Sequence, residues 1–175
     1  MIACQAELHS WGSANQVAFE ATKESFHILD SRRPQGDHFK ILSVVFDPKL
    51  SMHTAVKDLS LEAGWRVKTL LRSSRFYDVK ALIRLYKTKI LSFLEGATPA
   101  LFYASPSTLS NLDGIQSWFL QELHVTEESA LMRFHLAPLA LRRNFLMLGM
   151  LYKVSRGSAS PPVQRLFCLT PRNLV

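Results

Sequence analysis

The sequence predicts a mainly α-helical protein with a small antiparallel β-hairpin near the N-terminus, an α+β fold in which a helical bundle dominates. Beyond residue 55, apolar side chains recur every three or four positions over long stretches, which is the pattern of helices that bury one face. Between residues 26 and 46 the apolar runs are short and rich in β-branched and aromatic residues, which favour strands. Pro34 and Gly36 interrupt these runs and indicate a turn.

The composition bounds the class of protein and its partners. With 175 residues, of which 47% are hydrophobic, the chain can bury the core of one domain. Its net charge of +7 favours a polyanionic partner. The two cysteines, Cys4 and Cys168, form neither a disulfide framework nor a metal pattern, so we expect an intracellular protein, cytoplasmic or nuclear. No apolar run approaches the roughly 20 residues that cross a bilayer, so we expect no membrane span.

Residues 1–50 form the first predicted region. A short helix is expected over residues 2–14. The hairpin follows, with one strand at residues 26–29 and a second over the β-branched and aromatic run at residues 39–46. The basic loop at residues 31–37 is expected to connect the two strands.

Three helices are expected in residues 51–124. The first begins near Ala55 and is joined at Ser73-Ser74 to the second, which Gly96 should bend or end. The third runs over residues 109–124. Each helix has residues near its start whose side chains can accept a hydrogen bond from a free backbone amide. These candidate N-caps are Ser51 or Thr54, Asp78 or Ser74, and Ser107 or Thr108.

Two further helices are expected in residues 125–157. Thr126 is placed to begin one of them, and Pro138 precedes the other. The inner face of the last helix is expected to consist of its regularly spaced apolar residues, which are Leu141, Phe145, Leu148, Leu151 and Tyr152. Gly157 is a candidate C-cap, and residues 158–175 are expected to form a linker-like tail.

Basic residues line the outer faces of the first two long helices. Lys80, Arg84 and Lys87 share one helical face, and Lys68 and Arg72 share another. If the apolar seams pack together, both rows would lie on adjoining faces that suit a phosphate backbone. The candidate nucleic-acid-binding residues are Arg66, Lys68, Arg72, Arg75, Lys80, Arg84 and Lys87. The alternative is a helical protein-interaction scaffold, on which basic residues would be spread evenly. Attachment to an anionic membrane ranks last, because the apolar stripes are expected to be committed to a core.

The sequence shows no catalytic centre of its own. It contains no glycine-rich phosphate loop, no His-Glu-x-x-His and no Cys-x-x-Cys motif. The six histidines are scattered, and the only adjacent carboxylates, Glu127 and Glu128, point about 100° apart on a helix. No metal site is therefore predicted, and the residues indicate a binding module.

Several short motifs nevertheless occur in a recognisable order along residues 5–167. They are Trp11, Asn15, Val17, Phe19, Lys23 and Phe26; the run from Phe39 to Asp47 with Leu50 and His53; residues 85–87 and 93–96; residues 112–116 with Phe119 and Leu120; and residues 136–139 with residues 141–143. In this order and spacing they resemble the C-terminal part, from the end of the palm through the thumb, of the reverse transcriptases of non-LTR (LINE-type) retrotransposons.

This resemblance implies an organisation and a function. Residues 1–50 would be the end of a palm, residues 51–124 thumb helices that grip the template–primer, and residues 125–157 a C-terminal helical extension. Lys23 matches the lysine that protonates the pyrophosphate leaving group in such polymerases. The chain would thus be a fragment of an RNA-directed DNA polymerase that binds an RNA or DNA template–primer.

The resemblance also implies that this chain alone is inactive. The family's Tyr/Phe-Ala-Asp-Asp motif does not occur in the 175 residues and would lie upstream of Met1. An intact polymerase would use Mg²⁺ at those aspartates, whereas no cofactor is expected in this chain. The missing upstream polymerase region is a candidate partner, beside the nucleic acid.

Overall fold

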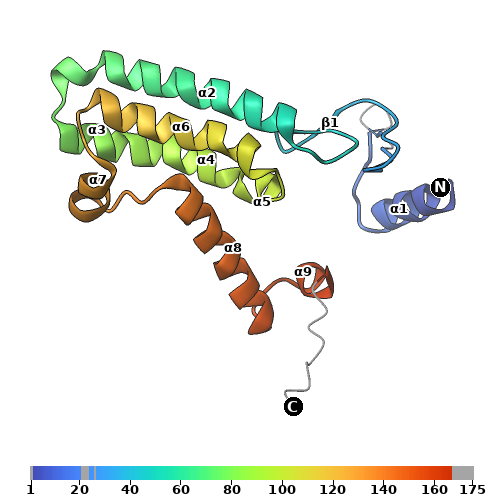
Figure 1. Ribbon diagram of the computed structural model, residues 1–175. Coiled ribbons are helices and arrows are strands. Elements are labelled where there is room, and N and C mark those ends of the chain that lie inside the picture. The colour runs from blue at the N-terminus through green and yellow to red at the C-terminus, as the bar shows by residue number, and fades with distance from the viewer. Residues whose placement is uncertain (1, 21–23, 26, 167–175) are drawn as a thin grey trace.

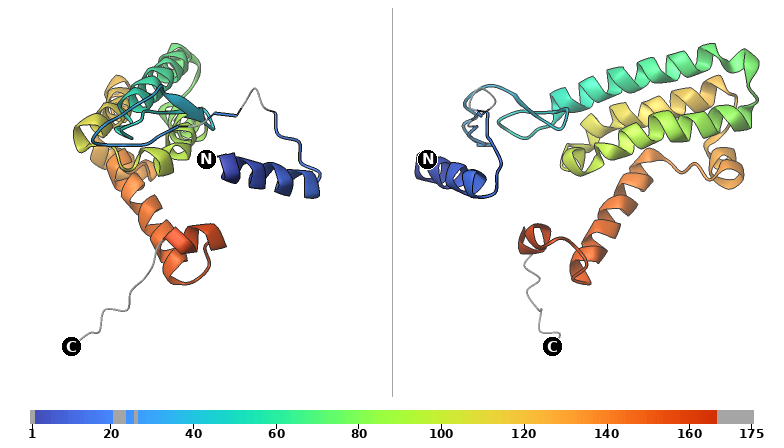
Figure 2. Two further views of the ribbon diagram at one scale, coloured as in Figure 1. Left: turned by 90° about the vertical axis from the view of Figure 1, so that its right-hand side faces the viewer. Right: turned by 180° about the vertical axis from the view of Figure 1, so that it is seen from behind.

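The computed structural model describes residues 2–20, 24–25 and 27–166, and in this part of the chain the predicted fold class is confirmed. Most of it is helical, and two short strands form an antiparallel sheet near the N-terminus. The helix α1 (Ile2–Ala14) forms where it was expected and lies apart from the bundle, beyond the hairpin (Figure 1, Figure 2). The chain therefore consists of a helical bundle with an N-terminal arm.

The bundle packs α2 against α6 and against the helical stretch that runs from α3 to α4 (Figure 1). Its elements are α2 (His53–Arg72), η2 (Ser74–Phe76), α3 (Val79–Tyr86), the π-helical turn η3 (Lys87–Leu91), α4 (Ser92–Gly96), α5 (Thr98–Leu101), α6 (Pro106–Glu122), α7 (Glu127–Phe134), α8 (Leu139–Ser155) and α9 (Pro161–Leu166). Tyr86 of α3 and Phe119 of α6 are fully buried and stack in the core, with ring centroids 4.4 Å apart. The junction expected at Ser73-Ser74 is confirmed by the break between α2 and α3.

The π-helical turn changes which side chains enter the core. A π turn accommodates an extra residue and rotates the faces that follow it relative to those before it. Leu91 is buried as a result, although regular helical spacing did not place it on the inner face. Val79, the first residue of α3, is 38% exposed.

The hairpin lies inside the run that was predicted to be a single strand. β1 (Phe39–Ile41) pairs with β2 (Val44–Phe46), with Phe39 opposite Phe46. Leu42 and Ser43 form the turn and both have positive φ, 47° and 70°, as a two-residue type I′ turn requires. The strand predicted at residues 26–29 was wrong for the described residues 27–29, which are irregular. A tight turn closes with little loss of chain entropy, so it outcompetes the longer loop.

Three of the predicted helix starts are confirmed or corrected by the hydrogen bonds at their N-caps. The side chains of Asp78 and Thr126 accept from the backbone amides of Ala81 and Ser129. The cap expected at residues 107 and 108 was wrong, because Ser105 accepts from the Thr108 amide and α6 begins at Pro106, which lacks the amide hydrogen that a helix start leaves free.

The start of α2 also differs from the prediction. Met52 occupies the N-cap position in the left-handed region, with φ of 60°, and its side chain caps nothing. The neighbouring amides are satisfied from outside the helix, since the Asp47 carboxylate accepts from Ser51 at 3.0 Å and from Met52 at 2.9 Å. Burial of Asp47 raises its pKa, but these hydrogen bonds outweigh burial, so the pKa lies below its usual value.

The inner face predicted for the last helix was wrong. Leu139, Arg143 and Val154 are the buried residues of α8, whereas the predicted set is between 43% and 62% exposed. The first turn of α8 faces the bundle instead, through buried Leu139 and through the ion pairs of Arg142 with Glu95 and Arg143 with Asp113. Gly157 has φ of 67° just after α8, as expected of a C-cap, and α9 forms in the segment that was expected to be linker-like.

Candidate nucleic-acid interface

The positive charge of the chain is concentrated in two stretches of sequence. Residues 63–94, which form most of the hairpin of α2 and the α3–α4 stretch, contain eight lysines and arginines and one acidic residue, Asp78. Residues 129–175 contain seven basic residues and no acidic one, and the remaining residues are acidic overall. Asp78 is engaged as the N-cap of α3. A local count of charge finds both stretches without any structure, whereas the candidates named from the sequence cover seven of the eight cations of the first stretch and none of the second.

The Arg66 side chain is 40% exposed, but its guanidinium is committed to contacts within the bundle. Its Nε donates to Glu62 at 3.0 Å, and its Nη1 donates to the Lys89 carbonyl at 3.3 Å. The guanidinium carbon lies 3.8 Å from the centroid of the Phe93 ring, which is a cation–π contact. Lys89 belongs to the π-helical turn, where regular helical hydrogen bonding is interrupted. Arg66 thus supports an irregular helix and is poorly placed to contact a phosphate.

Lys87 is also committed to the fold. Its ammonium group donates to the backbone carbonyl of Phe134, the last residue of α7, and its side chain is half-buried. A cation at the C-terminal end of α7 interacts favourably with the partial negative charge that the helix dipole places there. The chain leaves α7 immediately afterwards through His135, which has φ of 52°. Lys87 therefore fixes the end of α7 against α3.

The other five candidates are exposed to solvent and form no ion pair with any described residue. They are Lys68, Arg72, Arg75, Lys80 and Arg84. Arg72, Arg75 and Lys80 lie at the turn between α2 and α3, with Lys68 and Arg84 about one helical turn away on either side. We call these five residues the turn cluster.

The turn cluster is interleaved with exposed aromatic side chains. Trp65, Phe76 and Tyr77 are each at least half exposed. Lys68 lies 5.4 Å from the Trp65 ring and Arg75 lies 4.7 Å from the Phe76 ring, each measured to the ring centroid. Cations and aromatic faces side by side can contact phosphates and stack on unpaired bases.

The two basic rows do not form the single face that was expected from their spacing. Arg66 marks the side of α2 that faces α4, and Lys68 lies about 200° further around that helix. Lys87, which begins η3 directly after α3, marks the side of this helical stretch that faces α7, and Lys80 of α3 shares that side because seven residues make about two turns. The rows consequently point to different sides of the bundle and approach each other only at the turn.

The predicted catalytic lysine, a metal site and a membrane-spanning helix are not found among the described residues. Lys23 lies outside them, so its predicted role stays a prediction. Within the ranges that the structure describes, no three His, Cys, Asp or Glu residues come together as metal ligands, and no helix is long and apolar enough to cross a membrane.

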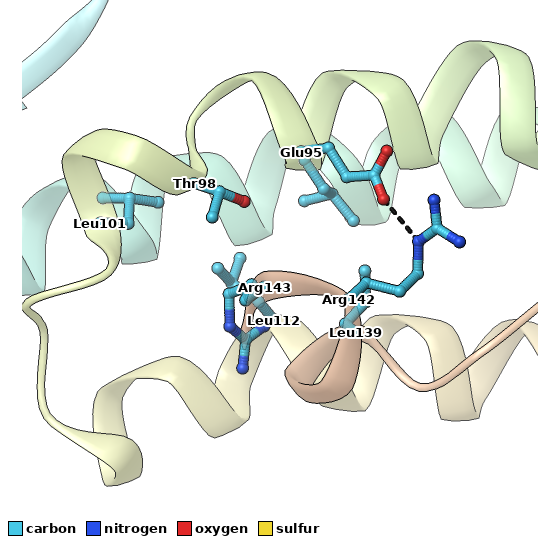
Figure 3. Close-up of a pocket in the computed structure, with 8 residues that line it drawn as sticks. Glu95, Thr98, Leu101, Leu112, Leu139, Arg142 and Arg143 are labelled. Atoms are coloured by element: carbon cyan, nitrogen blue, oxygen red, sulfur yellow. Dashed lines mark hydrogen bonds and ion pairs between the residues drawn. The ribbon is translucent and has the colours of Figure 1, made fainter. Parts of the chain in front are cut away.

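Two cavities lie between the elements of the bundle, away from the turn cluster. A groove of about 570 Å³ lies between the hairpin, α2 and α4, and its lining is mainly apolar apart from Ser43, Asp58, Glu62 and Ser92. A second cavity, between α4, α5, α6 and α8, encloses only about 10 Å³, room for one water molecule. Figure 3 shows Arg142 beside it, reaching Glu95 of α4 as part of an ion pair. Neither cavity gathers a nucleophile, a base and an oxyanion site.

Comparison of the chain with protein-family models, with curated proteins and with solved structures found no match. The turn cluster is therefore interpreted from its own chemistry and from the motifs in the sequence.

Proposed function

We propose that this chain is the end-of-palm and thumb part of a reverse transcriptase of the non-LTR retrotransposon type, and that it binds template–primer nucleic acid without catalysing synthesis. The single observation that carries the proposal is the turn cluster, in which five solvent-exposed cations that have no carboxylate partner among the described residues gather at one end of the α2–α3 hairpin. Phosphate contacts of this kind position a duplex and carry no sequence information.

The alternative function is a helical scaffold for other proteins. An even distribution of basic residues would favour it, but the charge is concentrated in two stretches. One observation does support a protein contact, the exposed apolar stripe of α8. This stripe lies on a different helix from the turn cluster, so the two contacts do not compete.

The salt dependence of binding tests the proposal. If all five cations of the turn cluster neutralise phosphates, log K for a labelled RNA–DNA duplex should fall with log salt concentration at a slope of about −4 to −5. The triple variant Arg72→Gln, Arg75→Gln, Lys80→Gln should flatten that slope by roughly two to three units. Fluorescence anisotropy over a salt series measures both slopes, and far-UV circular dichroism checks the fold of each variant.

A second triple variant controls for net charge. Lys153→Gln, Arg156→Gln, Arg165→Gln removes the same charge from exposed positions on and after α8 and should leave the slope within about half a unit of the parent. Equal slopes for the parent and the turn-cluster variant would overturn the proposed interface. Templated primer extension by this chain alone, with Mg²⁺ or Mn²⁺, would overturn the proposal that it lacks catalysis.

A further inference from the structure

The outer face of α8 carries a continuous apolar stripe with nothing packed on it among the described residues. Leu141, Phe145, Leu148 and Tyr152 are 43%, 62%, 61% and 61% exposed. At about 100° per residue these four side chains fall within roughly 60° of one another around the helix. Leu151, which is 45% exposed, flanks the stripe. Exposed large apolar residues that form one contiguous stripe indicate an interaction site, whereas scattered ones do not.

The opposite face of α8 is the one that holds it to the bundle. Leu139 and Arg143 are buried there, and Arg143 is paired with Asp113 of α6. The helix is therefore attached by one face and leaves the apolar stripe on the other face exposed. Figure 1 shows α8 extending away from the bundle after its first turns, so its outer face is open to a partner.

The spacing of the stripe indicates that its occupant is a helix. The four residues are separated by four, three and four positions, which are the alternating steps of the a and d sites of a heptad repeat over about three helical turns. In that register Arg142 and Arg156 occupy e positions, which flank the seam and set partner choice through charge. Arg142 is already paired with Glu95 of α4, so Arg156 is the flanking cation that a partner would meet.

Charge decides which helix would fit. From residue 129 to residue 175 the sequence contains no acidic residue, and Lys153 and Arg156 are exposed without an ion-pair partner in the described residues. Two copies of α8 packed on each other would bring together two segments whose charged side chains are all basic, which disfavours self-association. An acidic helix would instead complement these cations.

We infer that the outer face of α8 is a docking site for an amphipathic helix of another protein, with apolar residues at a and d positions and acidic residues on either side of them. This contact is separate from the turn cluster. Tyr152 and Phe145 would supply most of the buried area, because large aromatic side chains dominate such contacts.

A designed peptide tests the inference. The probe is a fluorescein-labelled helix of three heptads with Leu at a and d and Glu at e and g, whose own acidic flanks oppose its self-association. Anisotropy with the full chain at physiological salt should show binding. A matched peptide with Lys at e and g should bind at least ten-fold more weakly, because its flanks repel those of α8.

Variants of the chain locate the contact. Phe145→Gln with Leu148→Gln should weaken binding of the acidic peptide at least ten-fold. The control, Leu61→Gln with Met132→Gln, removes equally exposed apolar residues from α2 and α7 and should bind as the parent does. Far-UV circular dichroism confirms that both double variants are folded.

Several outcomes would overturn the inference. One is equal affinity of the parent and the α8 variant for the acidic peptide, and another is equal affinity of the acidic and basic peptides for the parent. A dimer in analytical ultracentrifugation that the α8 variant abolishes would assign the face to a second copy. Failure to bind the peptide together with α8-dependent binding to phosphatidylserine vesicles would assign it to a membrane surface.

Discussion

Replacing Asp113 by Asn removes the charge that holds α8 to the bundle while keeping the shape of the side chain. Arg143 donates to both carboxylate oxygens of Asp113, from Nη1 at 2.7 Å and from Nη2 at 3.0 Å. The Arg143 side chain is 8% exposed and the Asp113 side chain is 35% exposed. Water can solvate Asp113 when Arg143 is removed, but it can hardly reach Arg143 when Asp113 is changed. The two single variants should therefore lose different amounts of stability.

The exposures set the expected magnitudes. Removing one partner of a fully buried ion pair costs about 3–5 kcal/mol, and an exposed pair contributes about 0–1 kcal/mol. Asp113→Asn leaves a buried guanidinium without an anion, so we expect about 2 kcal/mol of destabilisation. Arg143→Met leaves a carboxylate that water can reach, so we expect about 1 kcal/mol. The double variant should also lose only about 1 kcal/mol, because no unpaired buried charge is left.

Urea unfolding followed by far-UV circular dichroism measures the four free energies of this cycle. The control is Lys153→Met on the same helix, an exposed lysine whose replacement should change the stability by less than about 0.5 kcal/mol. If the losses of the two single variants add in the double variant to within about 0.5 kcal/mol, the pair does not couple. The ion pair would then not be what holds α8.

Two other side chains give further predictions. Tyr86→Phe should stabilise the protein by up to about 1 kcal/mol in urea unfolding. The reason is that the Tyr86 hydroxyl is buried without a hydrogen-bond partner among the described residues, and this burial also raises the pKa of Tyr86. A loss of more than about 1 kcal/mol would show that the hydroxyl has a partner. Asp47→Asn should destabilise at neutral pH. Since the pKa of Asp47 is lowered in the folded state, its contribution is present above the unfolded value of about 3.9 and is lost as the pH falls below it. Urea unfolding of the parent and this variant over a pH series should therefore show their difference shrinking in acid, and a constant difference would contradict the role of the charge.

The sequence predicted those parts of the fold that depend on local chemistry. The helix starts at Asp78 and Thr126 were predicted because a capping side chain acts within three residues of its own position. The hairpin was misplaced because Leu42 and Ser43 adopt positive φ, for which neither residue type gives a signal. The orientation of α8 was missed because its attachment includes ion pairs with residues 30 and 47 positions away, and no pattern within the helix reports such contacts.

The candidate interface was predictable in part. Exposure of Arg72 and Lys80 follows from their helical positions opposite the apolar stripes. The internal roles of Arg66 and Lys87 do not, because their partners are a carbonyl in a π-helical turn and a carbonyl at the end of α7. Spacing identifies which face a cation lies on, but only the packing of neighbouring helices shows whether that face is free.

The concentration of charge in the α2–α3 hairpin also has a consequence for folding. Eight cations and one anion within 32 residues repel one another more strongly in the compact state than in an extended chain. Salt that screens this repulsion stabilises the folded chain and, at the same time, weakens its hold on phosphates. A polyanion that binds the folded state alone would relieve the repulsion and shift the equilibrium towards folding. The empty protein should thus be most stable under the ionic conditions in which it binds nucleic acid least, and the bound nucleic acid acts as a ligand for folding.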